Sequence, residues 1–344
     1  MSFKRLEADD FLVSSDAISS TCWTNDSPTL TTFFTSSVQE NGSSGDYYLN
    51  VFDAATTQSV QFAIAYGNAN GSGSANYNNA VNGLSPTSTI FGQWQDLTIG
   101  DENTNFIFGT ITSSEFFALP IERAAYKESL FLGSLTLNLS GSSGSIKLTD
   151  NSNYVSSVVF GAAGRVFQLI TGSAGVRATI SSRNTSDGYS ANSGSYGWLL
   201  PDIGTIILNP LALADFAVSG GIGLQYSGSA TASAAPNVSP NTSLFKAITG
   251  SGATFTLNSQ ETIVSDYVFV RPRSSEFNYS ENPSFISGST GEVLYSNFIN
   301  NPQVYITTIG LYNDTNELLA VAKLSRPLLK DFTKEALVRV KLDF

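Results

Sequence analysis

The fold class is decided by three segments near the C-terminus: Tyr305-Ile-Thr-Thr-Ile-Gly-Leu-Tyr-Asn-Asp314, Glu317-Leu-Leu-Ala-Val-Ala-Lys-Leu-Ser325 and Ala336-Leu-Val-Arg-Val-Lys-Leu-Asp-Phe344. In the third segment apolar and charged residues alternate, which is the period-two pattern of a half-buried strand. The first two segments flank the polar sequence Asn313-Asp-Thr-Asn316, which is typical of a tight turn. We therefore predict three short β-strands, of which the last orders the C-terminus.

Composition extends this prediction to the whole chain. Of the 344 residues, 41% are hydrophobic and 12% are aromatic, which favours a folded protein over a disordered one. Only 13% are charged, about half of the usual ~25%. Ser, Thr, Asn and Gly take the place of the Lys and Glu that favour helices. We predict a mainly β protein of two or three antiparallel β-sandwich-like domains, with long Gly/Ser/Asn-rich loops and few short helices.

Changes in sequence character predict three domains. They are an acidic N-terminal β domain (1–128), a Ser/Gly/Thr-rich middle β domain (129–265) and a C-terminal β domain (266–344). Strands are expected at 47–52, 60–66, 105–108, 135–139, 146–148, 165–170, 204–208 and 255–258. Helices are expected at 121–130 and from Pro210, with Asn209 as its N-cap. Long loops are expected at 67–79 and 227–240, where small and polar residues accumulate.

Charge is distributed unevenly along the chain. No Lys or Arg occurs between Leu6 and Glu122, whereas thirteen Asp and Glu do. Such a region repels phosphate backbones, so nucleic acid is not an expected partner. Residues 271–344 hold eight of the seventeen basic residues and eight acidic ones. The C-terminal region is therefore the expected docking region. Its candidate interface residues are Arg271, Arg273, Lys323, Arg326 and Lys330; the alternative is that these side chains are only solvated.

The residue types that most catalysis needs are scarce. The chain has no histidine and one cysteine, which excludes Ser-His-Asp and Cys-His activation and imidazole or thiolate metal sites. We expect no enzymatic activity, no cofactor and no metal. Cys22, beside Trp23, is interpreted as a buried small residue rather than a reactive thiol.

Three further patterns have a catalytic or binding interpretation and a structural one. Adjacent carboxylates at Asp9-Asp10 and Asp101-Glu102 are better explained as loop residues than as a glycosidase pair. Ser243-Leu-Phe-Lys246 matches the tetrad of acyl-serine enzymes without its other elements and outside an obvious helix. The aromatic residues near Trp94 could line a sugar site, but core packing is the favoured interpretation; they are Trp94, Phe106, Phe108, Phe116 and Phe117.

No membrane or export signal is expected. The N-terminal sequence lacks the apolar region of a signal peptide, and no run of ~18 apolar residues occurs. We therefore expect synthesis in a cytosol and no membrane partner.

The C-terminal quarter also resembles a known group of proteins. The segments at 305–322 and 338–344 resemble the small β domain that closes several baseplate and fibre-attachment proteins of contractile-tailed bacteriophages. The stretch from about Tyr267, with Glu276-Phe-Asn-Tyr-Ser-Glu-Asn-Pro-Ser284, resembles virion proteins of large T-even-like phages, including cyanophages. The resemblance implies a structural subunit of the virion, in the contractile tail or baseplate. It would bind other tail proteins and form homo- or hetero-assemblies. The alternatives are a neck, sheath-associated or capsid decoration protein, or a tail protein that binds host glycan.

Overall fold

The computed structural model is mainly β, as predicted. It describes residues 3–36, 47–55, 59–71, 86–109, 111–178, 196–214, 221–226, 233–234, 238–280 and 282–343. The chain divides into two compact units. We call Ile18–Glu261 the central unit, and Met1–Ala17 together with Thr262–Phe344 the terminal unit. The division falls inside two strands, β1 (Phe11–Thr21) and β19 (Asn258–Val270).

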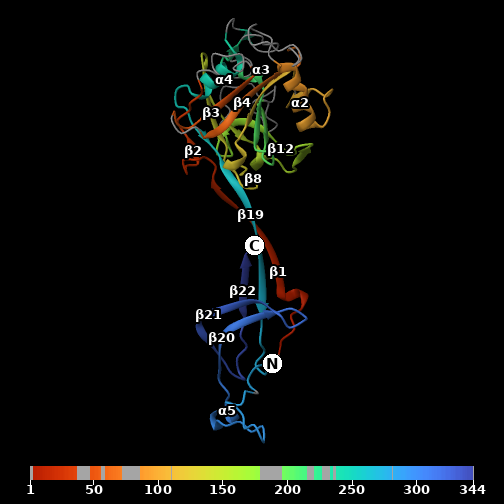
Figure 1. Ribbon diagram of the computed structural model, residues 1–344, viewed down its shortest axis with the longest axis vertical. Coiled ribbons are helices and arrows are strands. Elements are labelled where there is room, and N and C mark those ends of the chain that lie inside the picture. The colour runs from red at the N-terminus through yellow and green to blue at the C-terminus, as the bar shows by residue number, and fades with distance from the viewer. Residues whose placement is uncertain are drawn as a thin grey trace. The chain divides into compact units, whose positions relative to one another are not determined.

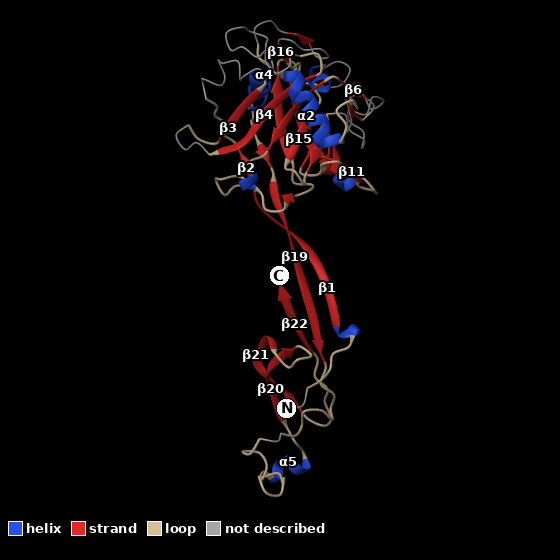
Figure 2. Cartoon of the chain, turned by 45° about the vertical axis from the view of Figure 1, so that its right-hand side comes forward, coloured by secondary structure: helices blue, strands red, loops and turns tan. Residues whose placement is uncertain are grey.

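One large, curled antiparallel sheet organises the central unit (Figures 1 and 2). Its strand order is β2-β18-β9-β10-β12-β14-β15-β7-β4-β3, and β11 and β13 add to β12. The strands are β2 (Thr29–Leu30), β3 (Tyr48–Phe52), β4 (Val60–Asn68), β7 (Glu115–Pro120), β9 (Thr136–Gly141), β10 (Gly144–Asp150), β11 (Val159–Gly161), β12 (Gly164–Ser173), β13 (Val176–Arg177), β14 (Gly197–Leu200), β15 (Thr205–Leu208) and β18 (Phe255–Thr256). Consecutive strands pair locally in β9–β10 and β14–β15, because each is joined by a short turn.

At β7 both faces of this sheet are covered by apolar side chains. In β7, Phe117 and Leu119 belong to one apolar cluster, and Phe116 and Ala118 to the other. Neighbouring residues of a strand point to opposite faces, so the two clusters lie on opposite sides of β7. Helix α2 (Thr87–Ile99) adds Phe91 to the second cluster. Helices α3 (Pro210–Ala214) and α4 (Pro240–Ile248), labelled in Figure 1, contribute side chains to the first cluster.

Short elements complete the central unit. They are β5 (Phe106–Phe108), β6 (Ile111–Ser113), β8 (Ser129–Leu130), β16 (Gln225–Tyr226), β17 (Ser233–Ala234) and the 3-10 turns η4 (Arg123–Ala125) and η5 (Ser152–Tyr154). The predicted strands and the helix from Pro210 are confirmed. Asn209 Oδ1 accepts the Leu211 N–H at 3.1 Å, as the N-cap prediction requires. Of the predicted loops, residues 72–79, 227–232 and 235–237 lie outside the described residues.

The helix predicted at 121–130 is wrong. Only η4 is helical, and the chain then becomes extended in β8. The Leu130 and Phe131 N–H groups donate to Pro201 and Asn258 carbonyls, at 3.0 and 2.8 Å. Pairing with β19 and the burial of Tyr126 and Leu130 therefore override the helix propensity of this segment.

Domain boundaries differ from those predicted. Strands from both sides of residue 128 belong to one sheet, in which β7 pairs with β15 and β2 pairs with β18. The boundary predicted after residue 128 therefore falls inside the central unit. The boundary predicted after residue 265 lies close to the division at 261/262, and the terminal unit additionally includes residues 1–17.

Two small sheets form most of the terminal unit. In the first, β19 lies between β1 and β22 (Val338–Asp343), with Ser265 opposite Asp343 and Val270 opposite Val338. The second is the hairpin of β20 (Val304–Tyr312) and β21 (Leu318–Lys330). Helix α5 (Ser296–Asn300) and the 3-10 turn η1 (Ala8–Asp10) complete the unit. The three predicted C-terminal strands are confirmed, but the third pairs with β19 and not with the hairpin.

Candidate interaction surface

The terminal unit buries very few apolar side chains. Among its described residues, only Val268, Ala336 and Val340 are buried hydrophobic residues. The central unit, by contrast, has two extensive apolar clusters. The terminal unit thus has regular secondary structure with almost no core of its own.

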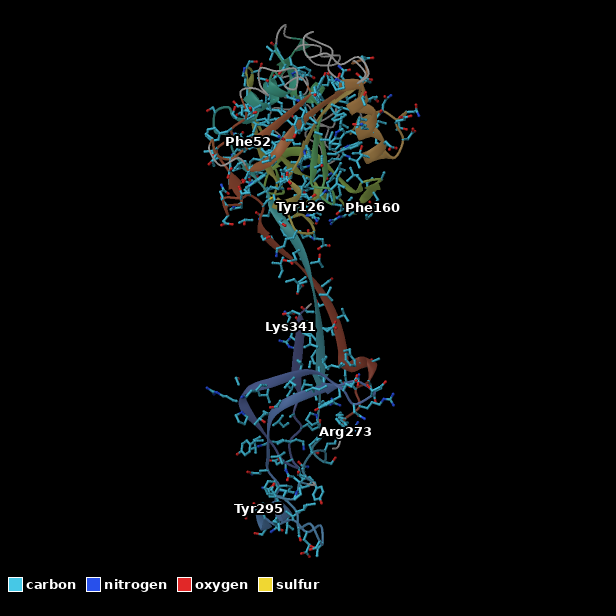
Figure 3. The ribbon with its side chains drawn as sticks, viewed as in Figure 1. Phe52, Tyr126, Phe160, Arg273, Tyr295 and Lys341 are labelled. Atoms are coloured by element: carbon cyan, nitrogen blue, oxygen red, sulfur yellow. The ribbon has the colours of Figure 1, made fainter. Side chains whose placement is uncertain are left out.

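Large apolar side chains of the terminal unit are exposed instead. They include Phe3, Phe11, Leu12, Val13, Val264, Phe277, Tyr279, Leu294, Tyr295, Ile299, Tyr305, Tyr312, Leu318, Leu319, Val321, Leu328, Phe332 and Leu337. Figure 3 labels Tyr295, which comes directly before α5. Each residue is 37% to 68% exposed. Scattered exposed apolar residues are normal, but a concentration of this size indicates an interaction surface.

The hairpin β20–β21 is the clearest part of this surface. Neither strand has another strand partner among the described residues. No apolar side chain of the hairpin is buried, and Leu319 and Val321 are 68% and 58% exposed. An isolated two-stranded hairpin is marginally stable in water. The exposed face of the hairpin is therefore a candidate surface for a covering partner.

The turn of this hairpin is well defined locally. Asn313 Oδ1 accepts the N–H groups of Thr315 and Glu317, at 3.1 and 2.8 Å. Asn316 has a φ of 61°, which asparagine tolerates better than most residues. The sequence signal for the turn is thus explained by local hydrogen bonds.

Four of the five predicted interface residues are exposed, and the fifth, Lys330, is buried. Arg271 and Arg273 follow β19, and Lys323 and Arg326 lie on β21 (Arg273 is labelled in Figure 3).

Lys330 does not belong with them. It is fully buried, and its Nζ donates to Ser274 O at 3.1 Å and to Asn278 Oδ1 at 2.8 Å. Burial lowers the pKa of this ammonium, while Glu276 and Asp331 partly oppose the change. Lys330 is therefore not a candidate interface residue, because its ammonium is buried and hydrogen-bonded inside the terminal unit.

An ion pair joins the two chain segments of the terminal unit. Lys4 Nζ lies 3.0 Å from a Glu276 carboxylate oxygen, and the Arg273 backbone N–H donates to the same carboxylate at 2.8 Å. The hydrogen bond from Arg273 and then the bond from Lys4 hold the pKa of Glu276 below its usual value. Sequence reasoning missed this pair, because its members are 272 positions apart and no local pattern links them.

A hollow of about 370 Å³ lies in the same unit. It is lined by Phe277, Asn278, Tyr279, Ser280, Phe285, Phe298, Gln303, Val304 and Tyr305. Phe277 has a φ of 56°, which is strained for a bulky side chain. The Asn278 amide is used internally, since its nitrogen donates to Ser274 O and its oxygen accepts from Lys330.

The aromatic residues near Trp94 form core, as favoured from the sequence. Phe106, Phe108 and Phe116 are fully buried, and Trp94 and Trp198 pack against them. Phe117 lies in the other cluster, across β7. The four phenylalanine rings are therefore not available to a sugar, and Trp94 is partly buried against them.

The other candidate chemical groups also have structural roles. The tetrad 243–246 lies in helix α4, contrary to expectation, but Ser243 is buried and donates to Gln225 O at 2.8 Å, whereas Lys246 is exposed. The Ser243 hydroxyl thus donates to the backbone, and the exposed Lys246 is not its acceptor. Cys22 is only 2% exposed, and burial raises its thiol pKa to about 12. The prediction of a buried, small residue is confirmed.

Carboxylates in the described chain serve turns and the interior. Asp101 accepts the Asn103 N–H at 2.9 Å, and Asp10 accepts the Glu7 N–H at 3.0 Å. Glu115 is fully buried and accepts a hydrogen bond from the Tyr66 hydroxyl. Within the described residues, no group of three or more His, Cys, Asp or Glu side chains is placed to hold a metal ion. No helix in the described ranges is long and apolar enough to cross a membrane.

No family model, curated protein or solved structure matches this chain. The exposed surface of the terminal unit is therefore the main basis for inferring a function.

Proposed function

We propose that this chain is a non-enzymatic structural subunit of a tailed-bacteriophage virion, most closely associated with the contractile tail near the baseplate. Its terminal unit docks it to neighbouring tail proteins. The observation that carries this proposal is the terminal unit itself, which has ordered strands but, among its described residues, only three buried hydrophobic side chains and two buried prolines. A unit of this kind is completed by assembly.

The resemblance to phage proteins also supports docking through the terminal unit. The residues that carry it form β20, its turn, the first part of β21 and β22. Arg271, Arg273, Lys323 and Arg326 add exposed positive charge there. These side chains can pair with carboxylates of a neighbour and set the orientation of docking.

The test is incorporation into particles. All four exposed basic residues are replaced by Ser in the phage that encodes the chain, and the chain is quantified by mass spectrometry of purified particles. Reduced incorporation is expected. The matched control replaces Lys147 and Lys246, which are exposed residues of the central unit, and should leave incorporation normal.

The same particles locate the subunit. Purified tails and capsids are analysed separately, and the chain is expected in the tail fraction. Its presence only in capsids or necks would favour the decoration or neck alternative. Its absence from all particles would refute the proposed function.

A further inference from the structure

The terminal unit can gain stability by covering apolar surface with a partner. Among its described residues only three hydrophobic side chains and two prolines are buried, while many large apolar side chains are exposed. Burial of one such exposed side chain contributes about 1.5–3 kcal/mol. A standard interface buries about 800 Å² on each partner, and the exposed apolar residues of the unit are the surface available for such a contact.

The strand edges show where a partner would pair. Natural proteins protect free strand edges with charged residues and proline. β21 carries Lys323, Arg326 and Pro327, and β22 carries Arg339, Lys341 and Asp343. β20 has the sequence Val304-Tyr-Ile-Thr-Thr-Ile-Gly-Leu-Tyr312, with no charge and no proline. β20 is therefore an unprotected edge that favours pairing with another strand.

The distribution of charge favours a second copy of this chain as the partner. The terminal unit has ten Lys and Arg against thirteen Asp and Glu, a difference of only −3. The central unit has seven against fifteen, a difference of −8. Two terminal units can therefore meet with little net repulsion, which two central units cannot.

Self-pairing also sets a condition on the strand itself. In a two-fold contact each residue of one strand faces a residue of the identical strand, so like charges must not fall opposite one another. β20 meets this condition in every register because it has no charged residue. β1 carries Asp16, and β21 would place Lys323 and Arg326 near their own copies.

We propose that two copies of this chain associate through antiparallel pairing of β20 with β20, which joins their hairpins into one four-stranded sheet. In this sheet the two β21 strands lie at the outer edges, and the exposed face that carries Leu319 and Val321 extends across all four strands. This inference does not depend on a virion role, since it concerns the purified chain alone.

Thr307 provides the test position. It is exposed, and it has no partner on β21 because the register shifts between Ile306 and Thr308. Thr307→Lys and Thr307→Glu each place like charges across the proposed contact. The wild-type chain, of 36.6 kDa, is expected to have at least twice that mass by light scattering at micromolar concentration. Each variant should need an at least about tenfold higher concentration to associate.

Mixing separates a specific contact from simple misfolding. An equal mixture of the Lys and Glu variants places opposite charges together and should restore association. The control Val159→Lys changes an exposed residue of β11 in the central unit and should leave the mass unchanged. A monomeric wild-type chain, variants that still associate, or a mixture that stays dissociated would each overturn the proposal.

Discussion

Lys330 shows how a single side chain can be misinterpreted from sequence. In the strand pattern it follows two leucines and reads as a surface lysine. Its ammonium instead binds Ser274 O and Asn278 Oδ1, which are 56 and 52 positions away. No local periodicity can reveal a partner at that separation. By contrast, Cys22 was predictable, because a chain without histidine offers no group to activate a thiol.

The buried ammonium gives a direct prediction. Lys330→Ala removes the donor and leaves the Asn278 amide oxygen without this partner, whereas Ser274 O still accepts from the Asn278 nitrogen. We therefore expect the terminal unit to lose roughly 1–3 kcal/mol of unfolding free energy. Hydrogen exchange of peptides from residues 270–340 measures this loss. Lys323→Ala on the same strand is exposed and should change the value by less than about 0.5 kcal/mol. Equal effects of both substitutions would contradict the buried role of Lys330.

The pair Arg165–Asp202 predicts a pH dependence in the central unit. Burial raises the pKa of Asp202, but hydrogen bonds from the Arg165 side chain and backbone outweigh it, so the pKa lies below its ordinary 3.8. The stability that Asp202 contributes is therefore fully present above pH 3.8 and is lost as pH falls through the lower, folded-state value. Asp202→Asn should lower Tm at pH 6 and reduce the fall in Tm on acidification. An identical pH profile in the variant would contradict this assignment.

At the scale of elements, hairpins were easier to predict than helices. The β9–β10 and β20–β21 hairpins combine alternating strands with turn residues, and both signals are local. Helix α2 was missed, because its sequence Thr87-Ser-Thr-Ile-Phe-Gly-Gln-Trp-Gln-Asp-Leu-Thr-Ile99 has a central glycine and several β-branched residues. It is held by the burial of Phe91 against the sheet, which is a tertiary effect.

The β14–β15 hairpin depends on the glycine at its start. Gly197 has a φ of 145°, and a Cβ there would lie 1.8 Å from the Ile207 carbonyl oxygen. Gly197→Ala should therefore cost roughly 1–3 kcal/mol, measured by urea unfolding of the full chain. Gly92→Ala in α2 is the matched control, because a Cβ at this position meets no atom within 4 Å. It should stabilise by up to about 1 kcal/mol. A destabilised Gly92→Ala or a neutral Gly197→Ala would be contrary to the packing described.

At the scale of the whole molecule, fold class was predictable and unit boundaries were not. Composition and alternation specify strands, but they do not specify which strands pair. The central sheet places β18 between β2 and β9, so it joins segments more than 100 residues apart. Docking through the region near the C-terminus stays a prediction; the exposed apolar residues of this region were not expected from the sequence.

The two units should differ in how stability responds to concentration. The central unit has its own core, so its unfolding should be independent of protein concentration. The backbone amides of the terminal unit should become more protected from exchange as protein concentration rises. Mass action then favours the associated state, in which this unit is covered. Trp23, Trp94 and Trp198 all lie in the central unit, so tryptophan fluorescence reports its melting alone. Hydrogen exchange of peptides from 300–340 reports on the terminal unit. Coincident, concentration-independent transitions would contradict this separation.

The burial of Cys22 has a practical consequence. The chain has one thiol, and in the folded state that thiol is both covered and held protonated by a pKa of about 12. An alkylating reagent at neutral pH should thus modify the protein only when the central unit opens. One added mass per molecule then records one opening event. The rate of alkylation therefore measures how often the central unit opens spontaneously. It can be measured in a mixture, in a particle or in a cell lysate, without any engineered label.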